Sequence, residues 1–120
     1  MIIITNNPRV AKEISNKKII YEECTYIEIL KQCRDMIHRG YELLSHPLYG
    51  SIKPNETPYR SIIIKEGKSL DTNSLILIEE AINTASKFQI NKKTPKWTTT
   101  VLDDFQVIDL DIISNTLQRI

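Results

Sequence analysis

The pattern of apolar and polar positions along the chain predicts short strands that alternate with helices. Residues 2–4 are three consecutive isoleucines, and such a β-branched run is typical of a strand buried on both faces. Similar apolar segments predict strands at 18–22, 41–44 and 59–65. Helical connections between the first three strands favour parallel neighbours. We therefore expect one α/β domain over residues 1–120, with a small, layered, mostly parallel, Rossmann-like sheet of about four strands flanked by helices.

Capping signals indicate where the first helices begin and end. Asn7 followed by Pro8 predicts a short helix, because asparagine caps helices and proline is tolerated at the first helical position. Thr25 and Glu28 have the spacing of a capping box, so they predict the start of a second helix. Gly40 supplies the expected stop of that helix.

Two further helices are expected in the second half of the chain. One begins after Asp71 or Thr72, and the other is an acidic C-terminal helix from Asp103. The stretch 87–97 is rich in lysine and contains a proline, so we expect it to be a basic irregular segment between the two helices.

Composition and charge exclude several classes of function. The 120 residues include 16 lysines and arginines and 15 acidic residues, so no net field favours nucleic acid or an anionic membrane. Apolar runs are too short to span a bilayer, and no secretory signal is visible. Two cysteines are too few for a metal cage and suit a reducing compartment. We expect a soluble cytoplasmic protein without metal, cofactor, nucleic acid or membrane, and no pattern indicates a homodimer.

Polar residues are concentrated in loops that follow the predicted strands. In open α/β sheets, ligands bind outside the carboxyl ends of the parallel strands. Three loops are expected to meet at that edge, and they contain Thr5-Asn6-Asn7, Cys24-Thr25 and Ser45-His46.

The long connection 45–58 is the most suggestive of these loops. An irregular segment of this length is often a binding loop or a lid. His46 can titrate near neutrality, and Lys53 and Arg60 could neutralise a phosphate or carboxylate. The candidate ligand-binding residues at this edge are Thr5, Asn6, Asn7, His46, Ser51, Lys53, Asn55, Glu56 and Arg60.

Each candidate also has a purely structural interpretation. The prolines of the long loop can simply rigidify it, and Asn6 and Asn7 are typical turn and cap residues. His46 has no titratable partner at a diagnostic spacing, so no catalytic residue is assigned. The dipole of the second helix could lower the pKa of the Cys24 thiol.

Two segments carry a family resemblance. Thr5-Asn6-Asn7-Pro8 and the loop from His46-Pro47-Leu48-Tyr49-Gly50 to Pro58-Tyr59 resemble the GrdX-like family, and Leu77-Ile78-Glu79-Glu80-Ala81 fits it as well. That family consists of small proteins encoded beside glycine reductase in anaerobic, amino-acid-fermenting bacteria. The resemblance implies a role near the reductive cleavage of glycine, sarcosine or betaine, and it carries no catalytic residues.

Three hypotheses follow. The first is an accessory or binding protein of the glycine reductase system, whose loops hold a small anionic ligand or a segment of a reductase component. The second is a small enzyme with His46 as acid or base. The third is a structural adaptor that docks through the proline-rich loop, with Tyr49 and Tyr59 as anchors.

Overall fold

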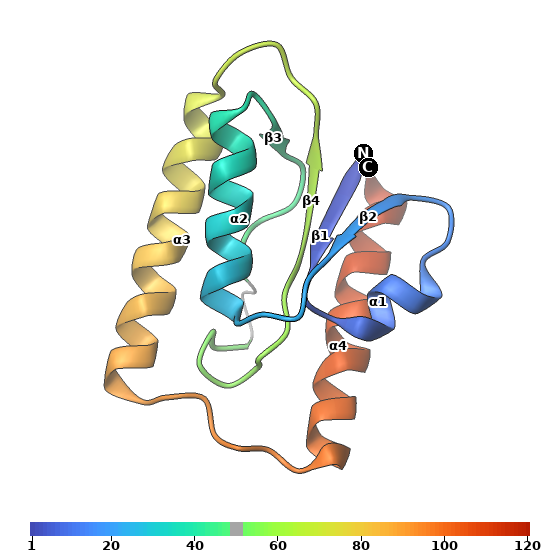
Figure 1. The fold of residues 1–120 in the computed structure, drawn as a ribbon, viewed down its shortest axis with the longest axis vertical. Helices are drawn as coiled ribbons and strands as arrows, with labels where there is room; N and C mark the ends of the chain where they lie inside the picture. The colour runs from blue at the N-terminus through green and yellow to red at the C-terminus, as the bar shows by residue number, and fades with distance from the viewer. Residues whose placement is uncertain (49–51) are drawn as a thin grey trace.

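A mixed sheet lies at the centre of the molecule (Figure 1). The computed structural model describes residues 1–48 and 52–120. Within those residues the sheet has four strands in the order β2-β1-β4-β3, which are β1 (Ile2–Thr5), β2 (Lys18–Tyr21), β3 (Glu42–Leu43) and β4 (Ser61–Lys65). Strand β1 pairs in parallel with β2, whereas β4 is antiparallel to both β1 and β3.

The expectation of a mostly parallel sheet is therefore wrong, and the strand order does not establish a Rossmann-like arrangement. Because β1 and β3 are both antiparallel to β4, strands β1, β2 and β3 do run in one direction, as their helical connections require. Strand β4 follows a connection whose described residues form no helix, and it inserts between β1 and β3. The carboxyl ends of β1, β2 and β3 thus lie at one edge, together with the start of β4.

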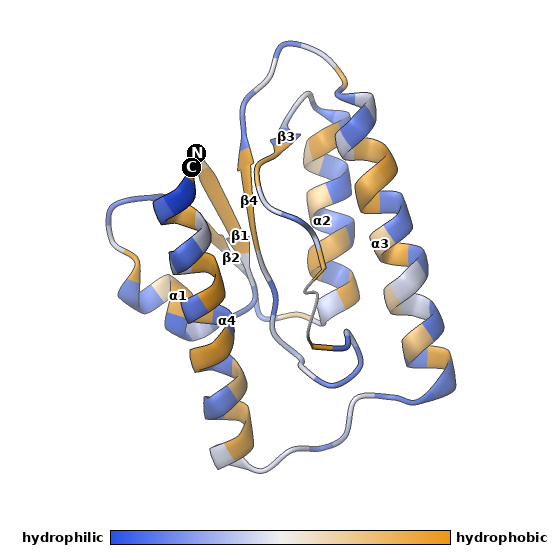
Figure 2. Cartoon of the chain, turned by 180° about the vertical axis from the view of Figure 1, so that it is seen from behind, coloured by the Kyte–Doolittle hydropathy of each residue, from blue (hydrophilic) through white to orange (hydrophobic). Residues whose placement is uncertain are grey.

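Helices cover both faces of the sheet (Figure 1). Helices α2 (Tyr26–His38) and α3 (Thr72–Asn91) lie on one side, and α1 (Pro8–Glu13) and α4 (Thr99–Arg119) lie on the other. The β1 isoleucines alternate between these layers: Ile2 and Ile4 join the core under α2 and α3, and Ile3 packs with Ile113 of α4. Figure 2 shows the hydrophobic colouring of β1 and β4 between the two layers.

The predicted capping residues occupy their expected positions. The Asn7 side chain accepts a hydrogen bond from the backbone N–H of Arg9 at the start of α1. Thr25 and Glu28 form the reciprocal capping box of α2. Gly40 follows α2 with φ of +101°, a left-handed conformation that glycine adopts without strain.

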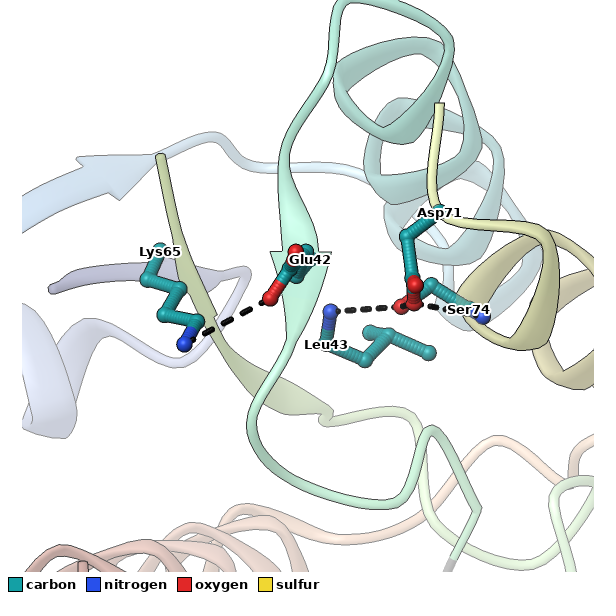
Figure 3. A network of polar contacts seen from close by, with 5 residues as sticks. All are labelled: Glu42, Leu43, Lys65, Asp71 and Ser74. Carbon is teal, nitrogen blue, oxygen red and sulfur yellow. Dashed lines mark hydrogen bonds and ion pairs between the residues drawn. The ribbon is translucent and has the colours of Figure 1, made fainter. Parts of the chain in front are cut away.

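The start of α3 is tied to the short strand β3 (Figure 3). Asp71 caps α3 by accepting hydrogen bonds from the backbone and hydroxyl of Ser74. The Ser74 hydroxyl oxygen accepts the backbone N–H of Leu43 at 2.9 Å. Lys65 and Glu42 form an ion pair at 3.4 Å across the β3–β4 pair. These contacts fix the edge strand although it has only two residues.

The C-terminal third differs from the sequence prediction at two boundaries. Helix α3 continues to Asn91, so residues 87–91 of the expected irregular segment are helical. Helix α4 begins at Thr99, before the expected Asp103, because the Thr98 side chain caps it by accepting the N–H of Val101. No helix within the described ranges is long and apolar enough to cross a membrane.

Candidate functional site

A buried polar network lies where β1 ends and β4 begins. Thr5, Asn7 and Ser61 are each fully buried, although all three have polar side chains. The Thr5 and Ser61 hydroxyl groups are 2.6 Å apart, and Thr5 Oγ1 accepts the backbone N–H of Asn7 at 2.9 Å. The pairing of β1 with β4 places Thr5 opposite Ser61. The register of the sheet therefore brings together Thr5 and Ser61, which are 56 positions apart in the sequence.

Asp109 of α4 completes this network. Its Oδ2 atom accepts from Ser61 Oγ at 2.7 Å and from Asn7 Nδ2 at 2.9 Å, and its Oδ1 accepts the Ser61 N–H at 3.1 Å. When Asp109 is ionised, the Ser61 hydroxyl donates to its carboxylate, and the Thr5 hydroxyl then donates to Ser61. The network is a directed chain of hydrogen bonds that ends on one carboxylate.

The Asp109 network attaches α4 to the sheet. Burial raises the pKa of Asp109 to about 7, and hydrogen bonds from the Asn7 side chain and the Ser61 backbone act in the opposite direction. Asn7 Nδ2 also donates to the carbonyl of Gln106. Sequence reasoning did not select Asp109. A signal was available, because Asp109 shares one helical face with the apolar Ile113 and Leu117, and a polar residue on an apolar face indicates a buried polar contact.

Asn6 joins three of the loops expected at this edge. Its amide nitrogen donates to the carbonyl of Cys24 at 2.9 Å and to the carbonyl of Pro58 at 2.8 Å. Its amide oxygen accepts the backbone N–H of Arg60 at 2.8 Å. The Asn6 side chain thus makes all of its hydrogen bonds with backbone groups, and it sets the spacing of the loops.

Arg60 holds the beginning of the long loop. Its Nε donates to the carbonyl of Pro47 at 2.6 Å, and its Nη2 donates to the carbonyl of His46. Burial lowers the pKa of Arg60 to about 10, while Tyr26 and Cys33 raise it. With 2% of its surface exposed, Arg60 binds protein carbonyls and points away from solvent.

His46 is exposed and interacts with its own loop. Its Nδ1 accepts the backbone N–H of Leu48 at 3.0 Å. Among the described residues, no carboxylate or hydroxyl group forms a hydrogen bond with the His46 ring. The geometry of a catalytic base with an orienting partner is therefore not present in that part of the chain. Ser51 and Tyr49 lie outside the described residues.

Cys24 does not have the reactive thiol that the helix dipole suggested. Burial, followed by the charges of Glu22 and Glu28, raises the pKa of the Cys24 thiol to about 11. The two carboxylates and partial burial outweigh the dipole of α2, because each of them disfavours the thiolate. Cys24 is a neutral thiol at physiological pH.

Three other predicted residues form a separate surface site, which we call the lysine pocket. Lys53, Asn55 and Glu56 of the long loop meet the α3–α4 connection around a cavity of about 190 Å³. The connection contributes Lys92, Lys93, Pro95 and Trp97. Three lysines and one glutamate therefore line a single small cavity. Figure 1 shows this connection and the 53–58 segment at the same end of the molecule.

Hydrogen bonds fix the walls of the lysine pocket. Asn55 Nδ2 donates to the carbonyl of Lys92 at 2.9 Å, and Trp97 Nε1 donates to the carbonyl of Glu56 at 2.7 Å. Asn55 is 7% exposed, and within the described residues its side-chain oxygen has no hydrogen-bond partner. The loop is thus clamped to the connection.

A wider, mostly apolar depression adjoins the lysine pocket, and we call it the interhelix groove. It has a volume of about 650 Å³ and lies between the start of α2 and the end of α3. Residues 24–27, Pro58, residues 89–90 and residues 93–94 line it. Lys93 lines both depressions.

Seven of the nine predicted site residues therefore separate into two groups. Thr5, Asn6, Asn7 and Arg60 lie in the interior and hold loops and helices together. Lys53, Asn55 and Glu56 line a surface cavity with residues that sequence reasoning had assigned to a basic segment. Among the described residues, no group of three or more histidine, cysteine, aspartate or glutamate side chains could hold a metal ion.

Comparison with known proteins gives one match. A family model described as GrdX-like protein matches residues 2–118, which is nearly the whole chain. The chain belongs to the GrdX-like family. The resemblance seen in the Thr5–Pro8 segment and the long loop is thereby confirmed. No curated protein and no solved structure shows significant similarity to this member of the family.

Proposed function

We propose that this GrdX-like protein is an accessory protein of the glycine reductase system that binds a small anion in the lysine pocket. Membership of the family supports the association with glycine reductase, which is the context that its name suggests. The observation that carries the binding function is the convergence of Lys53, Lys92 and Lys93 on one cavity.

The charge balance of the pocket favours an anion. Among the described residues that line this cavity, Glu56 is the acidic one, against three lysines. Lysine ammonium groups attract phosphate and carboxylate as mobile point charges. A cavity of about 190 Å³ is below the usual range of about 300–1,000 Å³ for drug-sized ligands, so it suits a head group or a very small molecule.

Calorimetric titration with inorganic phosphate tests this function. Lys53→Gln and Lys92→Gln each remove one charge from the pocket, and we expect each to weaken binding about two- to fivefold. Lys68→Gln is the matched control, because Lys68 is exposed near the opposite end of α3. Equal affinities in all four proteins, or no binding by the wild type, would refute the proposal.

Association with glycine reductase needs a separate measurement. Native mass spectrometry of the protein mixed with purified glycine reductase components should detect a complex of defined stoichiometry. Spectra that contain only the separate components would contradict the accessory role and leave anion binding to be judged by the titration.

A further inference from the structure

The interhelix groove and the lysine pocket share a rim. Lys93 lines both depressions. A bound molecule whose charged group contacts Lys93 can therefore extend into the wider groove. The volume of the groove, about 650 Å³, lies within the range of small-molecule sites.

The walls of the groove are suited to an apolar group. Ile27, Pro58 and Ile90 contribute apolar surface, and Ile90 is 84% exposed. Covering exposed isoleucine with a ligand removes apolar area from water, which is favourable in proportion to the area covered. The Cys24 thiol is neutral, since burial raises its pKa to about 11. None of these side chains requires a polar partner.

Gln89, Thr94 and Thr25 of the groove already have partners, whereas the buried Tyr26 hydroxyl group has none among the described residues. Gln89 Nε2 donates to the Pro54 carbonyl at 3.3 Å and to Thr94 Oγ1 at 2.9 Å, and its Oε1 accepts the Thr94 N–H. The Thr25 hydroxyl accepts the N–H of Glu28 in the capping box. Lys93 is the charged residue of the lining, and no carboxylate lines the groove among the described residues.

We propose that the anion held in the lysine pocket has an apolar body, the size of a short acyl chain, which lies in the interhelix groove. This inference rests on the proposed function, since the lysine pocket holds the charged group. Charge complementarity selects the ligand: its anionic end faces Lys53, Lys92 and Lys93, and its uncharged chain contacts the walls contributed by Ile27, Pro58 and Ile90.

A series of straight-chain carboxylates tests the inference. Acetate, butanoate and hexanoate have the same charged group and differ in apolar length. Each methylene buried in the groove should tighten binding by up to about fourfold, and less where the groove leaves it partly exposed to solvent. Two-dimensional ¹⁵N–¹H NMR titration of the full chain measures each dissociation constant and locates the perturbed amides.

Two variants separate the groove from the lysine pocket. Ile90→Ser should remove most of the gain from acetate to hexanoate and leave acetate binding unchanged. Ile76→Ser is the control, because Ile76 is also exposed on α3 but does not line the groove. We expect hexanoate to perturb amides of residues 24–27 and 89–94, and acetate to perturb those near Lys53 and Lys92.

The outcomes distinguish this inference from the proposed function. Affinities that do not change with chain length, or a gain that survives in Ile90→Ser, would overturn the inference while anion binding stands. Absence of binding for all three carboxylates would overturn the inference, and phosphate titration would then decide the proposed function alone. Binding that tightens with chain length in the wild type but not in Ile90→Ser would establish that one ligand occupies both the lysine pocket and the interhelix groove.

Discussion

The raised pKa of Asp109 predicts an unusual dependence of stability on pH. The carboxyl group has a pKa of 3.8 when unperturbed and about 7 in the folded protein, mainly because it is buried. Between these values the folded state keeps a proton that the unfolded state releases. The free energy of unfolding should therefore fall as the pH rises through this interval. Most paired carboxylates produce the opposite slope.

The expected size of the effect follows from the two pKa values. A tenfold change in an ionisation constant corresponds to about 1.4 kcal/mol, so the rise from 3.8 to about 7 is worth about 4 kcal/mol. The contribution of Asp109 is fully present below its unfolded pKa and is lost above its folded pKa. Hydrogen bonds from the Asn7 side chain and the Ser61 backbone N–H lower the pKa of Asp109, so the value of about 7 already includes their effect.

The substitution Asp109→Asn isolates this contribution, since asparagine cannot titrate. Urea denaturation followed by circular dichroism should give the free energies of unfolding of wild type and variant at about pH 5 and about pH 8. The wild type should lose about 2.5 kcal/mol relative to Asp109→Asn between these conditions, because the rest of the effect is already lost between the unfolded pKa and about pH 5. Subtracting the variant removes the background from the other ionisable groups.

Asp111→Asn is the matched control for this experiment. Asp111 is exposed on the same helix, so its variant should follow the wild type across the pH range. If the difference between wild type and Asp109→Asn stayed constant or grew with pH, the assignment of a raised pKa to the buried carboxyl would be refuted.

Three other substitutions or reactions probe the same framework. Asn6→Ala should lower the free energy of unfolding by about 2–4 kcal/mol in urea denaturation, since it leaves loop backbone groups unpaired. A loss below about 1 kcal/mol would contradict the role of Asn6 in joining the loops. Thr25→Ala should cost about 1 kcal/mol by the same assay, and an unchanged midpoint would show that the α2 cap is dispensable. Cys24 should react with iodoacetamide roughly a hundredfold more slowly than glutathione near neutral pH, as measured by mass spectrometry, and comparable rates would contradict its raised pKa.

Local signals in the sequence predicted the strands and the helix caps well. The run Ile2-Ile3-Ile4 indicated a strand buried on both faces, and its residues do separate between two cores. Thr25 and Glu28 specified the start of α2 through the reciprocal hydrogen bonds of a capping box, which lie within the first turn of the helix. These features depend on residues close in sequence, so a single chain is sufficient to identify them.

Strand order and the deeper polar contacts could not be obtained in the same way. Helical connections set the common direction of β1, β2 and β3, but no local pattern indicates that β4 lies between β1 and β3. The partnership of Ser61 with Asp109 spans 48 residues and depends on that order. For the same reason, the sequence suggested Arg60 as a candidate to neutralise an anion but could not indicate that the fold buries it against the carbonyls of Pro47 and His46.

The sequence indicated the two segments that form the lysine pocket but not their contact. Lys53, Asn55 and Glu56 were candidates because they lie in a long polar loop, and Lys92 and Lys93 were part of a basic segment. The contact between the two segments depends on hydrogen bonds such as that from Asn55 to the Lys92 carbonyl. Composition can indicate two polar segments, but only the fold shows that they share one cavity.

The central claim is that this GrdX-like protein binds a small anion between the long loop and the α3–α4 connection. The most direct test is a ¹⁵N–¹H NMR titration of the full chain with inorganic phosphate. The account predicts saturable shifts of the amides at 53–56 and 92–97, which weaken in Lys53→Gln and persist in Lys68→Gln. Shifts that do not saturate, or that concentrate at residues outside these two segments, would contradict it.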